Sequence, residues 1–180
     1  MGSKKVFYWD SCMFYEVLGN ESVAPAKKSG VNEILKDNES GENVIITSVI
    51  THLEVLPEKL EAKNTGAETE YMNLFDSEHF GDVELSANII LRAREIRDYY
   101  YRVPDEGGLN AKMMDLGDAI HLATATIHSV DELHTRDDDK KGMKVPLLSL
   151  YEMYKQSKVC DKYDLKIVSP ESDQADLLDA

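Results

Sequence analysis

Four acidic residues stand at positions where carboxylates can do chemistry, namely Asp10, Glu54, Asp118 and Asp137. Asp10 follows a β-branched and aromatic run, Glu54 falls on a predicted helix, Asp118 opens a helix of small residues, and Asp137 follows a predicted strand. Carboxylates that met at one place would repel one another unless a cation neutralised them. Oxygen ligands without nearby Cys or His pairs suit Mg²⁺ or Mn²⁺ better than zinc. The pattern therefore predicts a divalent metal site.

The elements that must position these acids alternate between strand and helix. A run that ends at Asp10 leads directly into a helix that begins at Ser11. Ser48 is placed to cap a second helix, whose apolar face has Val49, Leu53 and Leu56. Polar residues dominate 59–82, where Tyr71, Leu74 and Phe75 allow one weak helix. The remaining predicted strands cover 6–9, 44–47, 83–85, 130–135 and 165–168, and the remaining predicted helices cover 31–39, 87–101, 116–128 and 147–155.

This alternation predicts an α/β layered fold with a largely parallel central sheet. The carboxyl ends of parallel strands, and the loops that follow them, meet at one edge of the sheet, which is the usual place for a site in open α/β folds. The four acids are therefore expected to converge at that edge.

Four sequence blocks resemble the PIN-domain nuclease family. They are Phe7–Ser11, Ser48–Glu54, Leu116–Ala125 and His134–Asp137. The third block is similar to the family's DAxxxATA helix and the fourth to its TxD turn, 19 residues further on. The resemblance implies a three-layer α/β/α sandwich with a mainly parallel sheet and helices on both faces. Within the family, the chain looks most like the VapC-type toxins of toxin–antitoxin pairs.

The resemblance further implies a metal-dependent endoribonuclease in which Asp10, Glu54, Asp118 and Asp137 hold one or two Mg²⁺ or Mn²⁺ ions. It implies an RNA substrate (tRNA, rRNA or mRNA), a small antitoxin protein as partner, and a homodimer. The alternative that we keep is a catalytically weak PIN scaffold that acts by binding another protein.

Residues next to the four acids are candidates for supporting roles. Ser11 and Thr135 are placed to hydrogen-bond a carboxylate or a metal-bound water, and Arg136 is placed to contact a phosphate. Asp138 is the alternative to Asp137 as the fourth ligand, because acidic residues continue after the TxD turn.

Each of these residues also has a purely structural interpretation. Asp10 and Asp118 suit helix N-caps, Glu54 suits a surface glutamate, and Asp137 suits a turn. We favour a shared metal site because the four occur together and in order.

Two further features stay open between a functional and a structural role. His121, one helical turn after Asp118, either touches RNA or a partner or is an ordinary partly buried histidine. Tyr99–Tyr101 either stack on bases or pack in the core, and the helical period places Tyr100 on the apolar face.

Composition limits the partners and the compartment. The formal net charge of −14 argues against nucleic-acid binding through a broad basic face and fits a basic protein partner. Cys12 and Cys160 are expected to be free thiols. The N-terminal stretch has acids where a signal peptide is apolar, and no run of about 18 apolar residues occurs, so we expect a cytoplasmic protein that does not span a membrane.

The length of 180 residues predicts one domain over 1–170. Within it, about 60–82 is interpreted as an insertion or a variable helical segment. The acidic stretch 171–180 is expected to be a flexible tail.

Overall fold

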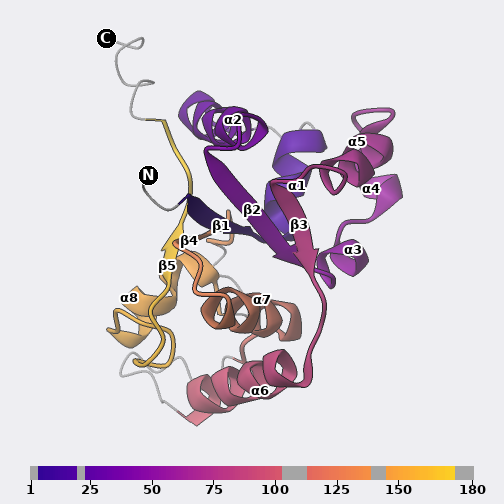
Figure 1. Cartoon of the computed structure of the whole chain (residues 1–180). Helices are drawn as coiled ribbons and strands as arrows, with labels where there is room; N and C mark the ends of the chain where they lie inside the picture. Colours follow the sequence, from indigo (N-terminus) through magenta and orange to yellow (C-terminus); the bar gives the residue numbers. More distant parts are fainter. Residues whose placement is uncertain (1–3, 20–22, 103–112, 139–144, 173–180) are drawn as a thin grey trace.

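A five-stranded, all-parallel sheet lies at the centre of the chain (Figure 1). The computed structural model describes residues 4–19, 23–102, 113–138 and 145–172. The strand order is β3-β2-β1-β4-β5, so the first strand is central. Tyr8 of this strand pairs with Ile46 on one side and with Leu133 on the other. The strands are β1 (Lys5–Trp9), β2 (Asn43–Ser48), β3 (Phe80–Val83), β4 (Glu132–His134) and β5 (Lys166–Val168). The predicted α/β fold with a parallel sheet is confirmed.

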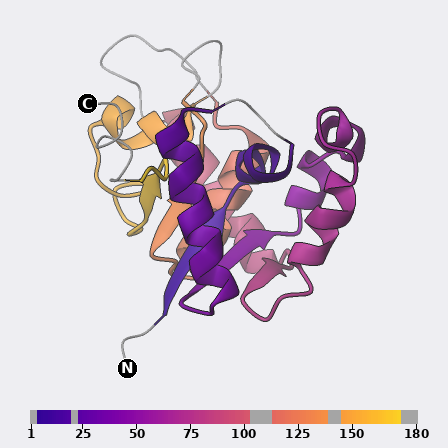
Figure 2. The same cartoon turned by 90° about the horizontal axis from the view of Figure 1, so that it is seen from above.

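Helices cover both faces of the sheet, as Figure 1 shows. On one side lie α1 (Ser11–Leu18), α2 (Pro25–Glu39), α4 (Pro57–Glu61) and α5 (Ala67–Leu74). On the other side lie α6 (Ala87–Arg102), α7 (Leu116–Ile127), the 3-10 helix η1 (Leu147–Ser149) and α8 (Leu150–Tyr154). Figure 2, which views the molecule from above, shows α2 running across the strands.

The residues of β1 divide between two hydrophobic cores because successive side chains of a strand point to opposite faces. Tyr8 packs with α6 and α7 in one core, whereas Phe7 and Trp9 pack with α1 and α5 in the other. The sheet is therefore buried on both faces, and its functional side chains can reach solvent only at its ends.

The boundaries of one predicted helix and one predicted strand were wrong. The helix expected over 31–39 begins six residues earlier, because Pro25 occupies its first position, where its missing N–H and fixed φ are favourable. The third strand is Phe80–Val83 rather than 83–85, because the buried Phe80 pairs with Ile45.

The long helix expected after Ser48 is absent from this stretch of the structure. Ser48 is instead the last residue of β2, and α3 (Thr51–Glu54) is a single turn. Pro57 disfavours helical backbone at Leu56, which is extended with ψ of 126°, so the chain restarts as α4. Leu53 is 79% exposed and does not form the predicted apolar face.

The stretch 60–82 is part of the folded layers. Leu60 and Tyr71 are buried in the core beneath α1, and the stretch contains all of α5 and most of β3. The backbone at Glu171 runs against α2, where a Cβ on Gly30 would meet it at 2.6 Å. Residues 171 and 172 of the predicted flexible tail lie against α2, and the N–H of Ser172 donates to Ala26 O at 3.0 Å. Residues 173–180 of the predicted tail lie outside the described residues.

Candidate functional site

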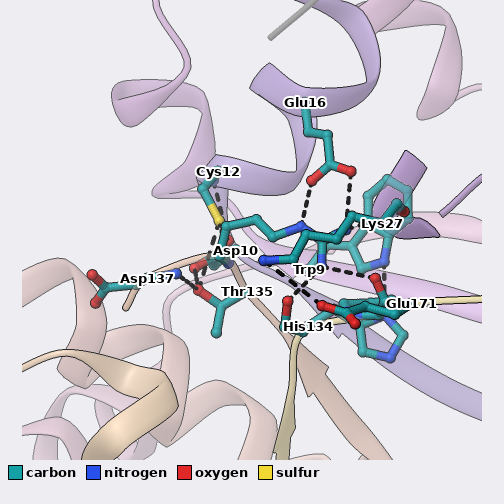
Figure 3. A network of polar contacts seen from close by, with 12 residues as sticks. Trp9, Asp10, Cys12, Glu16, Lys27, His134, Thr135, Asp137 and Glu171 are labelled. Atoms are coloured by element: carbon teal, nitrogen blue, oxygen red, sulfur yellow. Dashed lines mark hydrogen bonds and ion pairs between the residues drawn. The ribbon is translucent and has the colours of Figure 1, made fainter. Parts of the chain in front are cut away.

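Asp10 leaves the carboxyl end of β1 as a buried carboxylate that is 5% exposed. It caps α1, since its Oδ1 accepts the N–H of Cys12 at 3.1 Å and the Cys12 thiol at 2.7 Å. Its Oδ2 accepts the Thr135 hydroxyl. Figure 3 shows Cys12 and Thr135 converging on this carboxylate. The cap interpretation of Asp10 is correct, and capping does not remove the carboxylate from the edge of the sheet.

The buried environment of Asp10 shifts the pKa of its carboxyl group. Burial raises the pKa of Asp10, and the charge of Asp137 raises it further, while His121 and the hydrogen bonds of Cys12 and Thr135 oppose the shift. The same burial raises the pKa of the Cys12 thiol well above its ordinary value, so Cys12 stays a protonated donor to Asp10.

Asp137 lies beside this cluster at the end of β4. Its N–H donates to Thr135 Oγ1 at 3.0 Å, and its Oδ2 accepts the N–H of Leu147 at 3.1 Å. Figure 3 shows its carboxylate pointing away from Asp10. Asp138 is exposed. Because Asp137 is the acid whose charge acts on Asp10, it remains the better candidate of the two for the fourth ligand.

Arg136 does not fit the predicted contact with a phosphate. Its guanidinium donates to both oxygens of Glu16, at 2.5 and 2.9 Å. The remaining three N–H groups donate to Ser169 Oγ, Pro170 O and Lys27 O. These contacts use all five donors of an arginine side chain. Arg136 therefore ties β4 to α1, α2 and the segment after β5 (Figure 3 shows Glu16 and Lys27).

Glu54 reaches the site from α3, and two tyrosines and a histidine fix its surroundings. The Tyr15 hydroxyl donates to Glu54 O at 2.7 Å and accepts the N–H of Leu56 at 2.8 Å, which clamps the backbone of the single-turn helix. The Glu54 side chain is 32% exposed, and its Oε2 lies 2.8 Å from His121 Nε2. His121 Nδ1 lies 2.7 Å from the Tyr8 hydroxyl.

Gly117 leaves room for the same carboxylate. A Cβ at this position would lie 2.2 Å from Glu54 Oε1, far inside van der Waals contact. The sequence Leu116–Asp118 thus brings Glu54 against the first turn of α7. This contact places Glu54 next to the residue that precedes Asp118.

Asp118 lies in the first turn of α7 and is 8% exposed. The cap of this helix is Asp115, whose Oδ1 accepts the N–H of Gly117 at 2.9 Å. The capping interpretation is therefore wrong for Asp118. A carboxylate in the first turn is favoured by the helix dipole, which stabilises its charged form.

The sequence interpretation gave no role to Cys12 and left the role of His121 open. Cys12 and not Ser11 hydrogen-bonds Asp10, because the second helical position is the one that donates to an N-cap carboxylate. His121 is 1% exposed and joins Tyr8 to Glu54. The spacing of His121 from Asp118, one turn along the same helix, was the only signal for it.

The donor set has the chemistry of a site for a hard divalent cation. Asp10, Glu54, Asp118 and Asp137 supply carboxylate oxygens from four elements near one edge of the sheet, and two of them are buried. Within the residues that the structure describes, no three His, Cys, Asp or Glu side chains are grouped so that they could hold a metal ion as they stand. Binding of an ion therefore requires these carboxylates to move closer together.

The other open interpretations are decided by burial. Tyr100 is buried, and its hydroxyl accepts the N–H of Cys160 at 2.9 Å, so it packs in the core. Cys12 and Cys160 are free thiols, as predicted. In the described ranges, the helices lack the length and apolar character needed to cross a membrane.

No model of a known protein family matches this chain, and no curated protein sequence matches it. Among solved structures, the chain is similar to a chain of a toxin-antitoxin complex from Klebsiella pneumoniae. The two are 21% identical with a TM-score of 0.47, and the match covers 77% of this chain and 94% of that one. A likeness at this level assigns no family and no activity, so the PIN-domain resemblance stays a prediction.

Proposed function

We propose that this chain is a Mg²⁺- or Mn²⁺-dependent endoribonuclease of the PIN type and the toxin of a toxin–antitoxin pair. The observation that supports the proposal is that the four sequence blocks contact one another in pairs at the carboxyl end of a parallel sheet. Asp10 is bonded to Thr135 of the TxD turn, and Glu54 lies against the first turn of the helix that bears Asp118. Blocks that are far apart in the chain thus lie in contact in two pairs.

The acidic residues at the carboxyl end of the sheet would act by binding a divalent cation. Asp10, Glu54, Asp118 and Asp137 would hold the ion, and Cys12 and Thr135 orient the Asp10 carboxylate. A bound ion supplies a polarised phosphoryl oxygen and a water of lowered pKa. Arg136 is excluded from substrate contact by its bonds to Glu16, so the site would rely on metal rather than arginine to neutralise the phosphate.

The acidic composition fits a small basic antitoxin, because complementary charge raises association rate and specificity. Two exposed leucines flank the site: Leu53 precedes Glu54 and is 79% exposed, and Leu116 precedes Gly117 and is 58% exposed. Apolar side chains exposed beside an acidic site suit a partner segment that combines cationic and apolar residues. The RNA target is proposed to be tRNA, rRNA or mRNA, and the chain is proposed to be a homodimer.

Incubation of labelled total RNA with the protein tests the activity, in Mn²⁺ and in EDTA. Wild type is expected to cut RNA in Mn²⁺ only, and Asp10→Asn and Glu54→Gln are expected to cut no more than the EDTA control. An exposed acid near Glu54 in the chain supplies the matched control: Glu58→Gln should cut at the wild-type rate.

Cutting by Asp10→Asn at the wild-type rate, or wild-type cutting that survives EDTA, would overturn the assignment of the site. Loss of cutting in Asp138→Asn but not in Asp137→Asn would make Asp138, in place of Asp137, the fourth ligand. If wild type cuts nothing under any condition and binds a small basic protein tightly, the scaffold function replaces the nuclease.

A further inference from the structure

A pocket with a volume of about 320 Å³ opens between α6 and α7, two helices that lie side by side in Figure 1. The buried Ala93 of α6 and Ile120 of α7 line it, together with the exposed Ile90 and Leu116. Its volume is near the lower end of the roughly 300–1,000 Å³ of small-molecule sites. The pocket therefore has room for one planar group, such as a nucleobase, against apolar walls.

One stripe of α6 supplies most of the functional groups of this pocket. The stripe consists of Ile90, Arg94, Arg97 and Tyr101, which are three or four residues apart and follow one face of the helix. All four line the pocket. Tyr101 is 59% exposed, whereas Tyr100 is buried in the core. The Tyr101 ring can therefore stack on a base, and the Tyr100 ring cannot.

The charged side chains of the pocket give it a sign opposite to that of the chain. Arg94, Arg97 and Asp98 line it, two positive charges and one negative, whereas the chain has a net charge of −14. Arg97 is held from the segment before α7, since its Nε donates to Met114 O at 3.1 Å and its Nη2 to Met113 Sδ at 3.0 Å. These bonds use two of the five N–H donors of the guanidinium. A positioned cation and the exposed Arg94 thus provide the charge that binds a phosphate.

The pocket borders the predicted acids. Leu116 lines the pocket and directly precedes Gly117, where a Cβ would lie 2.2 Å from Glu54 Oε1. Ile120 also lines the pocket, two residues after Asp118. The first turn of α7 therefore lies between the pocket and the carboxyl edge of the sheet, and a strand of nucleic acid at that edge can extend into the pocket.

These features favour a single-stranded nucleic acid over a protein segment. An apolar helix of a partner would bury the aliphatic side chains of the pocket and would not need two arginines in the same stripe. A single-stranded RNA uses both, because its phosphates are attracted to arginines and its bases stack on exposed rings. The predicted acids repel phosphates, and a cationic pocket beside them offsets this repulsion locally.

We propose that the pocket between α6 and α7 binds one nucleotide of a single-stranded RNA, with its base against Tyr101 and the apolar walls and its phosphate on Arg94 and Arg97. This inference deepens the proposed function and rests on it for the choice of RNA. The bound phosphate is a neighbour of the scissile phosphate. The two arginines therefore hold the strand and take no part in the cleavage step.

Binding of uncleaved RNA tests the arginines. A fluorescein-labelled single-stranded RNA of mixed sequence is titrated with protein in EDTA, and fluorescence anisotropy gives the dissociation constant at several salt concentrations. Arg94→Gln should raise the dissociation constant about tenfold. It should also reduce the slope of log affinity against log salt concentration by about 0.7, the value for one phosphate contact of a single strand.

Arg92→Gln is the matched control for charge. It removes the same charge from the same helix, but the Arg92 guanidinium lies over the Tyr163 ring and does not line this pocket. The control should bind RNA like wild type. Arg94 is exposed, so its variant is expected to fold, and circular dichroism checks this.

The stacking of a base has its own test. Tyr101→Ala should raise the dissociation constant about tenfold, whereas Tyr101→Phe keeps the ring and should bind RNA like wild type. An abasic strand of the same length should bind wild type more weakly than RNA does. The abasic strand should also bind Tyr101→Ala and wild type equally, because the stacked base is absent.

The outcomes separate this inference from the nuclease itself. Wild-type RNA affinity in folded Arg94→Gln and Tyr101→Ala would overturn the inference even if the protein cuts RNA. An equal loss in Arg92→Gln would also overturn it, because RNA affinity would then follow net charge alone. If wild type binds no RNA and Arg94→Gln weakens association with another protein, the pocket is a protein interface and the inference fails. RNA that is bound with the expected losses but is not cut in Mn²⁺ would support the pocket and refute the nuclease proposal.

Discussion

Gly117→Ala should separate the stability of this protein from its activity. Gly117 is in the first turn of α7, and a Cβ there would meet Glu54 Oε1 at 2.2 Å. The atom that it meets is the far end of a flexible side chain rather than backbone. The helix can therefore accept the methyl group if the Glu54 carboxylate moves, and this movement breaks its contact with His121.

Gly117→Ala has two effects of opposite sign on the free energy of unfolding, and they are similar in size. Replacing glycine by alanine within a helix stabilises it by about 1 kcal/mol. Loss of the hydrogen bond between His121 and Glu54 costs about 1.5–3 kcal/mol for a charged acceptor, and the 32% exposure of the Glu54 side chain reduces this cost. The net destabilisation is therefore at most about 2 kcal/mol. A displaced ligand should, by contrast, lower Mn²⁺ affinity and RNA cleavage about 10–100-fold.

Urea unfolding in EDTA measures the destabilisation. Mn²⁺ titration and cleavage of labelled RNA measure the loss of metal affinity and of activity. Gly81→Ala is the matched control, because the added Cβ would meet no atom within 4 Å beyond Gly81 itself and its two chain neighbours. This control should cut RNA at the wild-type rate.

Wild-type cleavage and Mn²⁺ affinity in Gly117→Ala would refute the reasoning, since Glu54 would then work from another position. A destabilisation well above about 3 kcal/mol would also refute it, because the clash would then involve the backbone of α7 rather than the end of a side chain.

Three further predictions concern stability and reactivity. Because burial raises the pKa of Asp10, its contribution to stability is full below the unfolded pKa and is lost as pH rises through the folded value. In EDTA at neutral pH, Asp10→Asn should therefore unfold at a higher urea concentration than wild type and show a flatter pH dependence. Glu16→Gln should lower the free energy of unfolding by at most about 3–5 kcal/mol, because it removes the charged partner of the Arg136 guanidinium, which keeps its other acceptors. Burial raises the pKa of Cys160 to about 12, so a thiol reagent at about pH 8 should modify Cys160 and Cys12 in the native protein far more slowly than in urea.

Each of these three predictions has a result that would contradict it. Asp10→Asn less stable than wild type in EDTA would mean that the carboxylate is stabilised rather than penalised by its surroundings. The exposed pair of Lys158 and Asp164 is the control for Glu16→Gln, and equal effects of Glu16→Gln and Asp164→Asn would show that the buried pair is unimportant. Rapid native labelling of either thiol would show that its pocket opens readily.

The sequence alone was sufficient for the fold class and for the place of Asp10 and Asp137 after strands. The apolar runs that end at Trp9 and Thr47 are long enough for buried strands, and their alternation with helices leaves a parallel sheet as the simplest arrangement. Asp10 and Asp137 follow strands in the sequence, so their place at the carboxyl edge follows from the topology. Local chemistry also set the start of α1, because an aspartate before a helix caps it.

The tertiary structure decided which residues these acids contact. The bond between His121 and Glu54 joins residues 67 apart, and the ion pair between Arg136 and Glu16 joins residues 120 apart. No periodicity within one segment contains such contacts, because they depend on how the layers pack. The same reason turned Arg136 from an expected phosphate ligand into a buried connection between layers, and gave Gly117 and His121 their contacts with Glu54.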